Sequence, residues 1–169
     1  MKEEYDKGIM KRVDANDPEA LIQEAGEHYN KGDSKGAFEL YAKAADLGDA
    51  EGHYQLSTMY AKEQGVEEDK GKIIHHLELA AIGGHPEGRY FLGCIEWNND
   101  NADRAVKHWI ISATQGYDKA LKYLMDAFKG GLVSKEDLAS TLRAHQAAVD
   151  ASKSPQRDAA ERYLEMIGM

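Results

Sequence analysis

The sequence predicts an all-α protein built as a helical solenoid, and two observations support this fold class. Three segments of the chain end alike, and their terminal glycines, Gly48, Gly84 and Gly116, are 36 and then 32 residues apart. Before each glycine, apolar and small residues recur at the spacing i, i+4, i+7, i+8, which places them on one face of a helix. An internal period of this length is typical of helical repeat proteins, whose units bury their apolar faces against their neighbours.

The three stripes define the second helix of each repeat. Asp33, Asp69 and Asn101 stand directly before them, and side chains of this kind accept a hydrogen bond from a free amide of the first helical turn. The glycines at the far ends suit the left-handed backbone conformation that closes a helix. Because both ends are marked, the sequence predicts helices over residues 34–48, 70–83 and 102–115.

Each of these helices follows another apolar helical pattern. Pro18 and Pro86 stand at the first position of two of the first helices, where the missing amide proton of proline costs nothing. Leu56, Leu92 and Leu124 continue one register from repeat to repeat and extend it into a fourth first helix. The sequence therefore predicts three complete helix pairs and a partial fourth.

The repeats divide the chain into three regions. Residues 1–16 are a lead-in segment, residues 17–131 form the solenoid, and residues 132–169 form C-terminal capping helices. Within the solenoid, the repeats cover residues 17–48, 49–84 and 85–116, and a partial unit covers residues 117–131.

The C-terminal region contains two signals for the start of a helix. Ser134 is followed three residues later by Asp137, which is similar to a capping box. Ser154 is followed by Pro155, a pair that suits a cap and the first helical position. We therefore expect two helices that cover the open end of the stack, as terminal repeats must. A binding tail is the alternative for this region.

One stretch carries a recognisable motif. The segment "HYQLSTMYAKEQGVEEDKGKIIHHLELAAIGGHPEGRY" combines Leu and Tyr in a first helix with a Gly-Val turn, Asp-Lys, and a final Ala-Ala-x-x-Gly. This pattern resembles the Sel-one-like repeat (SLR) family of the tetratricopeptide superfamily. The matching positions are Leu56, Tyr60, Gly65, Val66, Asp69, Lys70, Ala80, Ala81 and Gly84. The third repeat keeps much of the motif with a shortened turn, and the first copy is looser.

The resemblance implies a right-handed α-α solenoid of about three to four SLR helix pairs with C-terminal capping helices. It also implies a non-catalytic adaptor or scaffold that binds a protein or peptide, such as a ubiquitin-ligase or signalling component. The flanking stretches resemble algal proteins in which a RING finger precedes SLR repeats. Because Cys94 is the only cysteine, the RING activity does not carry over, and the chain resembles only the repeat portion of that architecture.

The resemblance also indicates where a partner would bind, because the first helix of each pair lines the concave groove of such solenoids. The residues expected to face inward are Glu27, Asn30, Tyr54, Thr58, Tyr90, Trp97, Lys122 and Asp126. Tyr and Trp are enriched at interface hot spots, which favours the three aromatic members. The alternative is that these rings fill gaps between helices. Tyr41 and Trp109, on the apolar stripes of second helices, are expected in the core.

Two patterns raise the possibility of an enzyme. Gly32, Ser34 and Gly36 spell the G-x-S-x-G of a nucleophile elbow, but that elbow requires a strand before the serine, and the preceding segment is an amphipathic helix. The seven histidines include no i, i+4 pair and no H-E-x-x-H motif, so no metal or cofactor site is predicted. The sequence therefore predicts no catalytic residue. An enzyme with a composite hydrolase or metal site, and a purely structural module, are the alternatives.

Composition narrows the class of partner. The formal net charge of −9 and the pI near 5.2 disfavour nucleic acid and anionic membrane surfaces, which are bound by clustered Lys and Arg. No stretch approaches the length of an apolar membrane span, and the first residues contain no apolar signal-peptide core. We therefore expect a cytoplasmic or nuclear protein.

Overall fold

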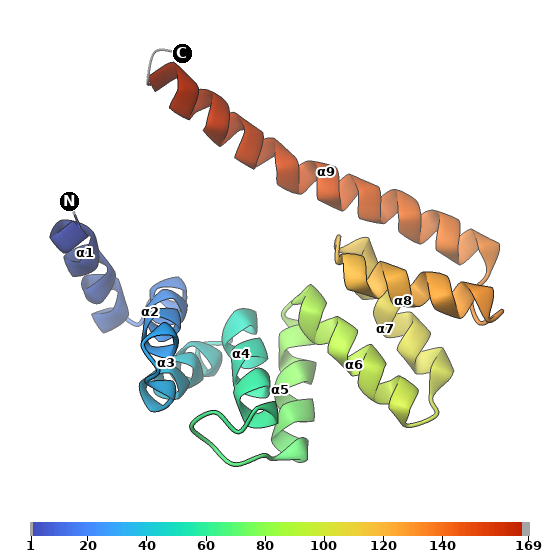
Figure 1. Ribbon diagram of the computed structural model, residues 1–169, viewed down its shortest axis with the longest axis horizontal. Coiled ribbons are helices and arrows are strands. Elements are labelled where there is room, and N and C mark those ends of the chain that lie inside the picture. Colours follow the sequence, from blue (N-terminus) through green and yellow to red (C-terminus); the bar gives the residue numbers. More distant parts are fainter. Residues whose placement is uncertain (1, 167–169) are drawn as a thin grey trace. The chain divides into compact units, whose positions relative to one another are not determined.

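The computed structural model describes the backbone of residues 2–166 and the side chains of residues 7–153. Nine α-helices and no strand occur in the described backbone (Figure 1). The helices are α1 (Lys2–Asp14), α2 (Pro18–Asn30), α3 (Ser34–Asp46), α4 (Ala50–Ala61), α5 (Lys70–Ile82), α6 (Pro86–Asn98), α7 (Ala102–Thr114), α8 (Asp118–Lys129) and α9 (Lys135–Met166). The predicted second helices α3, α5 and α7 each end within two residues of the expected position.

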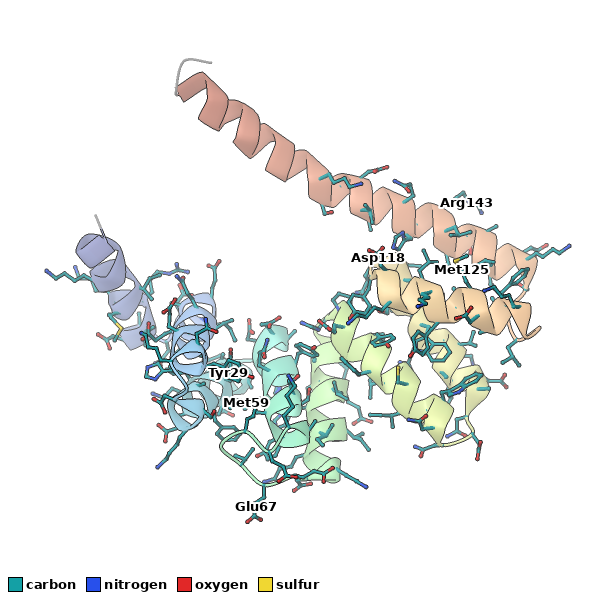
Figure 2. All side chains as sticks on the ribbon, in the orientation of Figure 1. Tyr29, Met59, Glu67, Asp118, Met125 and Arg143 are labelled. Carbon is teal, nitrogen blue, oxygen red and sulfur yellow. The ribbon has the colours of Figure 1, made fainter. Side chains whose placement is uncertain are left out.

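The chain forms two compact units, Met1–Leu92 and Gly93–Met169, with the boundary inside α6. In the first unit, α2 packs against α3 and α4 against α5, and α3 joins the two pairs. The core of this unit is formed by Ala25, Ala37, Tyr41, Ala45, Leu56 and Met59. Figure 2 shows Met59 inside the unit and Glu67 projecting from the loop between α4 and α5.

Small residues allow the helices of the first unit to approach closely. A Cβ atom added to Gly52 on α4 would lie 2.8 Å from the backbone nitrogen of Ala45 on α3. Ala44 and Ala45 are themselves 0% and 5% exposed. The Ala-Ala pair and the facing glycine therefore set the distance between successive repeats, and a larger side chain at either place would push the helices apart.

In the second unit, α7 packs against α8 and α9, and α8 also contacts α9. Trp109 on α7 is 2% exposed and Leu124 on α8 is fully buried. The expectation that Tyr41 and Trp109 belong to the core is confirmed, since Tyr41 is 6% exposed. The first turns of α9 contribute Thr141, which is 1% exposed, so the beginning of this helix covers the end of the stack.

Most of the side chains predicted to cap the start of a helix make the expected hydrogen bond. The Asp33, Asp49 and Asp69 carboxylates accept hydrogen bonds from the amides three residues later at 2.9, 2.8 and 3.0 Å. Asn101 is different, because its side chain accepts no capping hydrogen bond. Its amide nitrogen donates instead to the Glu96 carboxylate at 2.9 Å, which turns the group away from the helix.

The glycines that end the repeats have the predicted backbone conformation. Gly48, Gly84 and Gly116 have φ values of 85°, 87° and 90°. Residues with a Cβ atom rarely adopt this region, so glycine at these turns lets the chain reverse from one helix into the next without strain.

The two ends of the chain differ from the expectation. The lead-in segment contains the helix α1, which packs on α2 with Ile9 buried. The two predicted capping helices are a single helix, α9, which continues through Pro155 and extends beyond α7 and α8 (Figure 1). Ser134 makes the capping hydrogen bond, accepting from the Asp137 amide at 3.0 Å. Proline costs an interior helix about 3 kcal/mol, and strong helix formers on both sides of residue 155 offset this cost.

Candidate functional site

The residues predicted to line a groove are distributed over both units. Glu27, Asn30, Tyr54, Thr58 and Tyr90 belong to the first unit, and Trp97, Lys122 and Asp126 belong to the second. Five of the eight are exposed, namely Glu27, Asn30, Trp97, Lys122 and Asp126. Tyr54 and Thr58 are half-buried, and Tyr90 is only 7% exposed. The predicted residues therefore differ strongly in how much surface they offer to a partner.

Tyr54 belongs to an aromatic stack on the first unit. Its ring lies over the His85 imidazole with ring centroids 4.4 Å apart and planes 18° from parallel. The centroid of the Phe91 ring lies 6.3 Å from that of the Tyr54 ring. Burial, followed by the charge of Glu87 and a hydrogen bond to that carboxylate, raises the pKa of the Tyr54 phenol. The phenol therefore stays protonated and is already engaged with neighbouring side chains.

His85 is held in this stack by a carboxylate. Its Nε2 lies 2.9 Å from a Glu51 oxygen, and the Gln55 amide donates to the other oxygen of Glu51 at 2.6 Å. The hydrogen bond with His85 is the main cause that lowers the pKa of the Glu51 carboxyl. This arrangement fixes α4 against the start of α6, and most of its polar groups are committed to one another.

The second unit contains a pocket of about 260 Å³. The described residues that line it are Trp97, Trp109, Tyr123, Asp126, Ala127, Gly130 and Leu132. Two of the predicted groove residues, Trp97 and Asp126, therefore lie at one pocket, whereas Lys122 is not among its lining residues. The pocket is built by α6, α7, α8 and the turn after α8.

Three aromatic rings lie next to one another at this pocket. Trp97 and Trp109 have ring centroids 5.5 Å apart at 37°, and Trp109 and Tyr123 have centroids 5.2 Å apart at 59°. Trp109 is buried, whereas Trp97 and Tyr123 are 43% and 42% exposed. Leu132, in the turn that follows α8, is 45% exposed. A buried ring thus supports two exposed rings and an exposed aliphatic side chain.

Asp126 supplies the charge at this site. The Lys129 ammonium donates a hydrogen bond to the Asp126 carboxylate at 2.8 Å, and the two side chains are 72% and 60% exposed. This hydrogen bond is the main cause that lowers the pKa of the Asp126 carboxyl. Asp126 is therefore ionised at neutral pH, in a position open to solvent.

Sequence reasoning missed Tyr123 and Leu132 and assigned Trp109 to the core alone. For Tyr123 a signal was present, because it stands 32 residues after Phe91, the step that relates Gly84 to Gly116. The repeat register therefore placed another aromatic residue on a first helix. Leu132 lies outside the repeats, and no periodic signal marks it.

The groups considered for catalysis do not form a recognisable site. Ser34 is the first residue of α3 and follows the helix α2, and residues 2–166 contain no strand to build a nucleophile elbow. His53 and His76 pair through their Nδ1 atoms at 3.1 Å. Among the side chains that are described, no group of three or more His, Cys, Asp or Glu residues is arranged to hold a metal ion. No helix in the described part of the chain is long and apolar enough to cross a membrane.

Comparison with known proteins identifies similar solved structures. No protein-family profile matches the chain, and no curated protein matches it. A Sel1 repeat protein from Oxalobacter formigenes matches with a TM-score of 0.69 and 22% identity over 83% of this chain and 62% of that chain. The protective antigen c5321 of uropathogenic Escherichia coli, described as displaying an SLR fold, matches with a TM-score of 0.67 and 21% identity over 86% of this chain.

A third solved structure, that of MamA, matches with a TM-score of 0.50 and 20% identity over 89% of this chain and 86% of that chain. The chain spans only 62% of the Oxalobacter protein and 33% of c5321. Identities at this level show the fold alone. The matches agree with the helix pairs and their glycine turns, and they establish that this chain has the all-α solenoid fold of Sel1 repeat proteins.

Proposed function

We propose that this protein is a non-catalytic interaction module that binds a peptide or protein partner, and that the aromatic pocket of the second unit is its anchor site. The observation that carries the proposal is the cluster of Trp97, Trp109, Tyr123 and Leu132 around one cavity. Anchor side chains of a partner generally insert into pockets lined by Trp and Tyr, which account for a large share of interface hot spots.

The burial pattern supports this role. Trp97, Tyr123 and Leu132 each leave more than two fifths of their surface exposed although they lie beside buried Trp109. Single exposed apolar residues are ordinary on a protein surface, but a contiguous group that borders a cavity is typical of binding sites. Covering these rings removes apolar surface from water, which favours association by roughly 25 cal/mol per Å² before the costs of ordering.

Among the other exposed groove candidates, Lys122 on α8 belongs to the unit of the pocket, and polar residues of this kind form the rim around an apolar anchor. Glu27 and Asn30 on α2 belong to the first unit, where they are polar and accessible. We infer a smaller role for Tyr54, Thr58 and Tyr90, whose side chains are partly or fully buried. The module would act as an adaptor or scaffold, in keeping with the resemblance to SLR proteins of ligase and signalling assemblies.

Selection from a displayed peptide library tests the proposal. The purified chain is used as bait, and the affinity of enriched peptides is measured by calorimetry with the wild type, Trp97→Ala and Ile111→Ala. Ile111 on α7 is the matched control, because it is an apolar residue of the same unit with a similar exposure of 41%. We expect Trp97→Ala to weaken binding by at least about tenfold, the size of a hot-spot loss, and Ile111→Ala to leave it unchanged.

Two results would contradict the proposal. One is a library that yields no enriched peptide, and the other is an enriched peptide that binds folded Trp97→Ala as tightly as the wild type. The enzyme alternative is tested with the same preparation, by labelling with a serine-reactive fluorophosphonate and by metal analysis. Labelled Ser34 or a stoichiometric metal ion would favour that alternative.

A further inference from the structure

The aromatic pocket of the second unit contains one carboxylate. Among the described lining residues, Asp126 is the only one with a charged side chain, and it stands one helical turn after Tyr123 on α8. We propose that the anchor taken by this pocket is the cationic side chain of an arginine or lysine in a basic peptide segment. This inference rests on the proposed function and names the partner chemistry of the same site.

The exposed rings of Trp97 and Tyr123 provide the first part of the attraction. The face of an aromatic ring carries negative charge density, and a cation within about 6 Å of the ring centroid is attracted to it, most strongly by Trp. Trp97 and Trp109 are neighbours, and Tyr123 borders the same cavity. The fold already forms such a contact elsewhere, since the Lys72 ammonium of the first unit lies 5.1 Å from the centroid of the Tyr60 ring.

Asp126 provides the second part. Its carboxylate is ionised, and its pair with Lys129 lies in solvent, with side chains 60% and 72% exposed. Exposed ion pairs contribute little free energy. An incoming cation can therefore share the Asp126 carboxylate with Lys129, or take the place of Lys129, at small cost. An uncharged anchor would instead remove water from the carboxylate without returning an interaction. The site therefore favours a cationic side chain over an apolar one of the same length.

The charge that favours a basic occupant lies at the pocket itself. Of the net charge of −9, residues 93–169 carry only −1, with eleven Asp and Glu against ten Lys and Arg. The Asp126 carboxylate beside exposed aromatic rings therefore supplies the charge complementarity that favours a basic occupant over an aliphatic one.

Short peptides that differ at one residue test the inference. The peptides are acetyl-Gly-Ser-X-Ser-Gly-amide with X as Arg, Lys or norleucine, the last matching the length of the lysine stem without its charge. Binding is followed by tryptophan fluorescence, which reports on this pocket because Trp97 and Trp109 are the two tryptophans of the chain. We expect the Arg and Lys peptides to bind at least about threefold more tightly than the norleucine peptide.

Variants separate the two contributions. Asp126→Asn should reduce the preference for Arg and Lys over norleucine, whereas Glu136→Gln, which removes an exposed charge from α9 of the same unit, should keep it. Tyr123→Leu retains apolar surface but removes one ring, so it should weaken the binding of the Arg peptide more than that of the norleucine peptide. Circular dichroism confirms the fold of each variant. Added salt should weaken the binding of the Arg and Lys peptides and leave the binding of the norleucine peptide unchanged.

The outcomes distinguish this inference from the proposed function. If norleucine binds as tightly as Arg and Lys, or Asp126→Asn leaves the preference intact, the cationic anchor is wrong while the pocket remains a binding site. If the pentapeptides do not bind but library peptides bind through Trp97, the cationic anchor is also wrong. If neither kind of peptide binds at the pocket, both proposals fail.

Discussion

At the residue scale, the pair formed by His53 and His76 makes the first unit sensitive to acid. Burial, followed by the charge of neighbouring histidines, lowers the pKa of both imidazoles, that of His76 to about 4 from an ordinary 6.5. The Tyr60 ring stacks on His76, and His75 and Lys72 add positive charge while Asp46 opposes it. The folded protein thus holds both rings neutral at a pH where the unfolded chain would begin to protonate them.

This difference has a definite sign. Between pH 6.5 and about 4 the unfolded chain binds more protons at His76 than the folded protein does, so stability falls as the pH falls through that window and levels below it. We expect the melting temperature to decrease from pH 7 to pH 4.5 by more in the wild type than in His76→Gln, which has no imidazole to titrate. Parallel pH profiles for the wild type and His76→Gln would contradict the account.

Two glycines inside first helices lead to opposite predictions. A Cβ atom at Gly93 on α6 would lie 2.5 Å from Nε1 of buried Trp109 and 3.2 Å from the Ala105 carbonyl oxygen. A Cβ atom at Gly26 on α2 would lie 4.0 Å from its nearest neighbour, the Tyr41 hydroxyl. The two positions therefore differ in the room that they leave for a Cβ atom, and not in helix propensity.

We expect Gly93→Ala to lower the free energy of unfolding by about 1–2 kcal/mol, because overpacking outweighs the gain in helix propensity. Gly26→Ala should raise it by about 0.5–1 kcal/mol, because only the propensity changes. Urea denaturation followed by circular dichroism measures both. Changes of the same sign would show that the contact with Trp109 does not limit residue 93.

At the element scale, the ends of the helices are stabilised unequally. Asp49 accepts a hydrogen bond from the Gly52 amide at 2.8 Å at the start of α4. Asn101, the residue directly before α7, makes no such bond. Asp49→Ala should therefore cost about 1 kcal/mol of stability, whereas Asn101→Ala should change it by less than about 0.5 kcal/mol. Chemical denaturation of the two variants decides this, and equal losses would contradict the assignment of the caps.

The same scale shows where sequence reasoning succeeded and where it failed. Asp33 and Gly48 marked α3 correctly because a cap and a left-handed glycine act locally, within a few residues of the chain. Pro155 led to a wrong boundary, because the cost of an interior proline competes with the helix propensity of a long segment, and a local rule does not weigh the two. The helix α1 had no strong period and was not predicted.

At the scale of the whole molecule, the repeat period was sufficient to predict the solenoid fold, because each repeat reuses one way of burying an Ala-rich face. The site was only partly predictable. Trp97 and Asp126 were identified from their place on first helices, but their meeting with Tyr123 and Leu132 depends on how α6, α8 and the following turn pack in space. Tyr54 and Tyr90 were predicted by the same logic, and packing against neighbours left them little free surface.

The indole resonances of the two tryptophans test the central claim most directly. A library-selected peptide is titrated into isotope-labelled protein while the indole N–H signals of Trp97 and Trp109 are recorded, with Trp97→Ala used to assign them. We predict that both signals shift with the dissociation constant measured by calorimetry, because both rings line the pocket. A peptide that binds at that affinity while both indole signals stay in place would contradict the assignment of this pocket as the binding site.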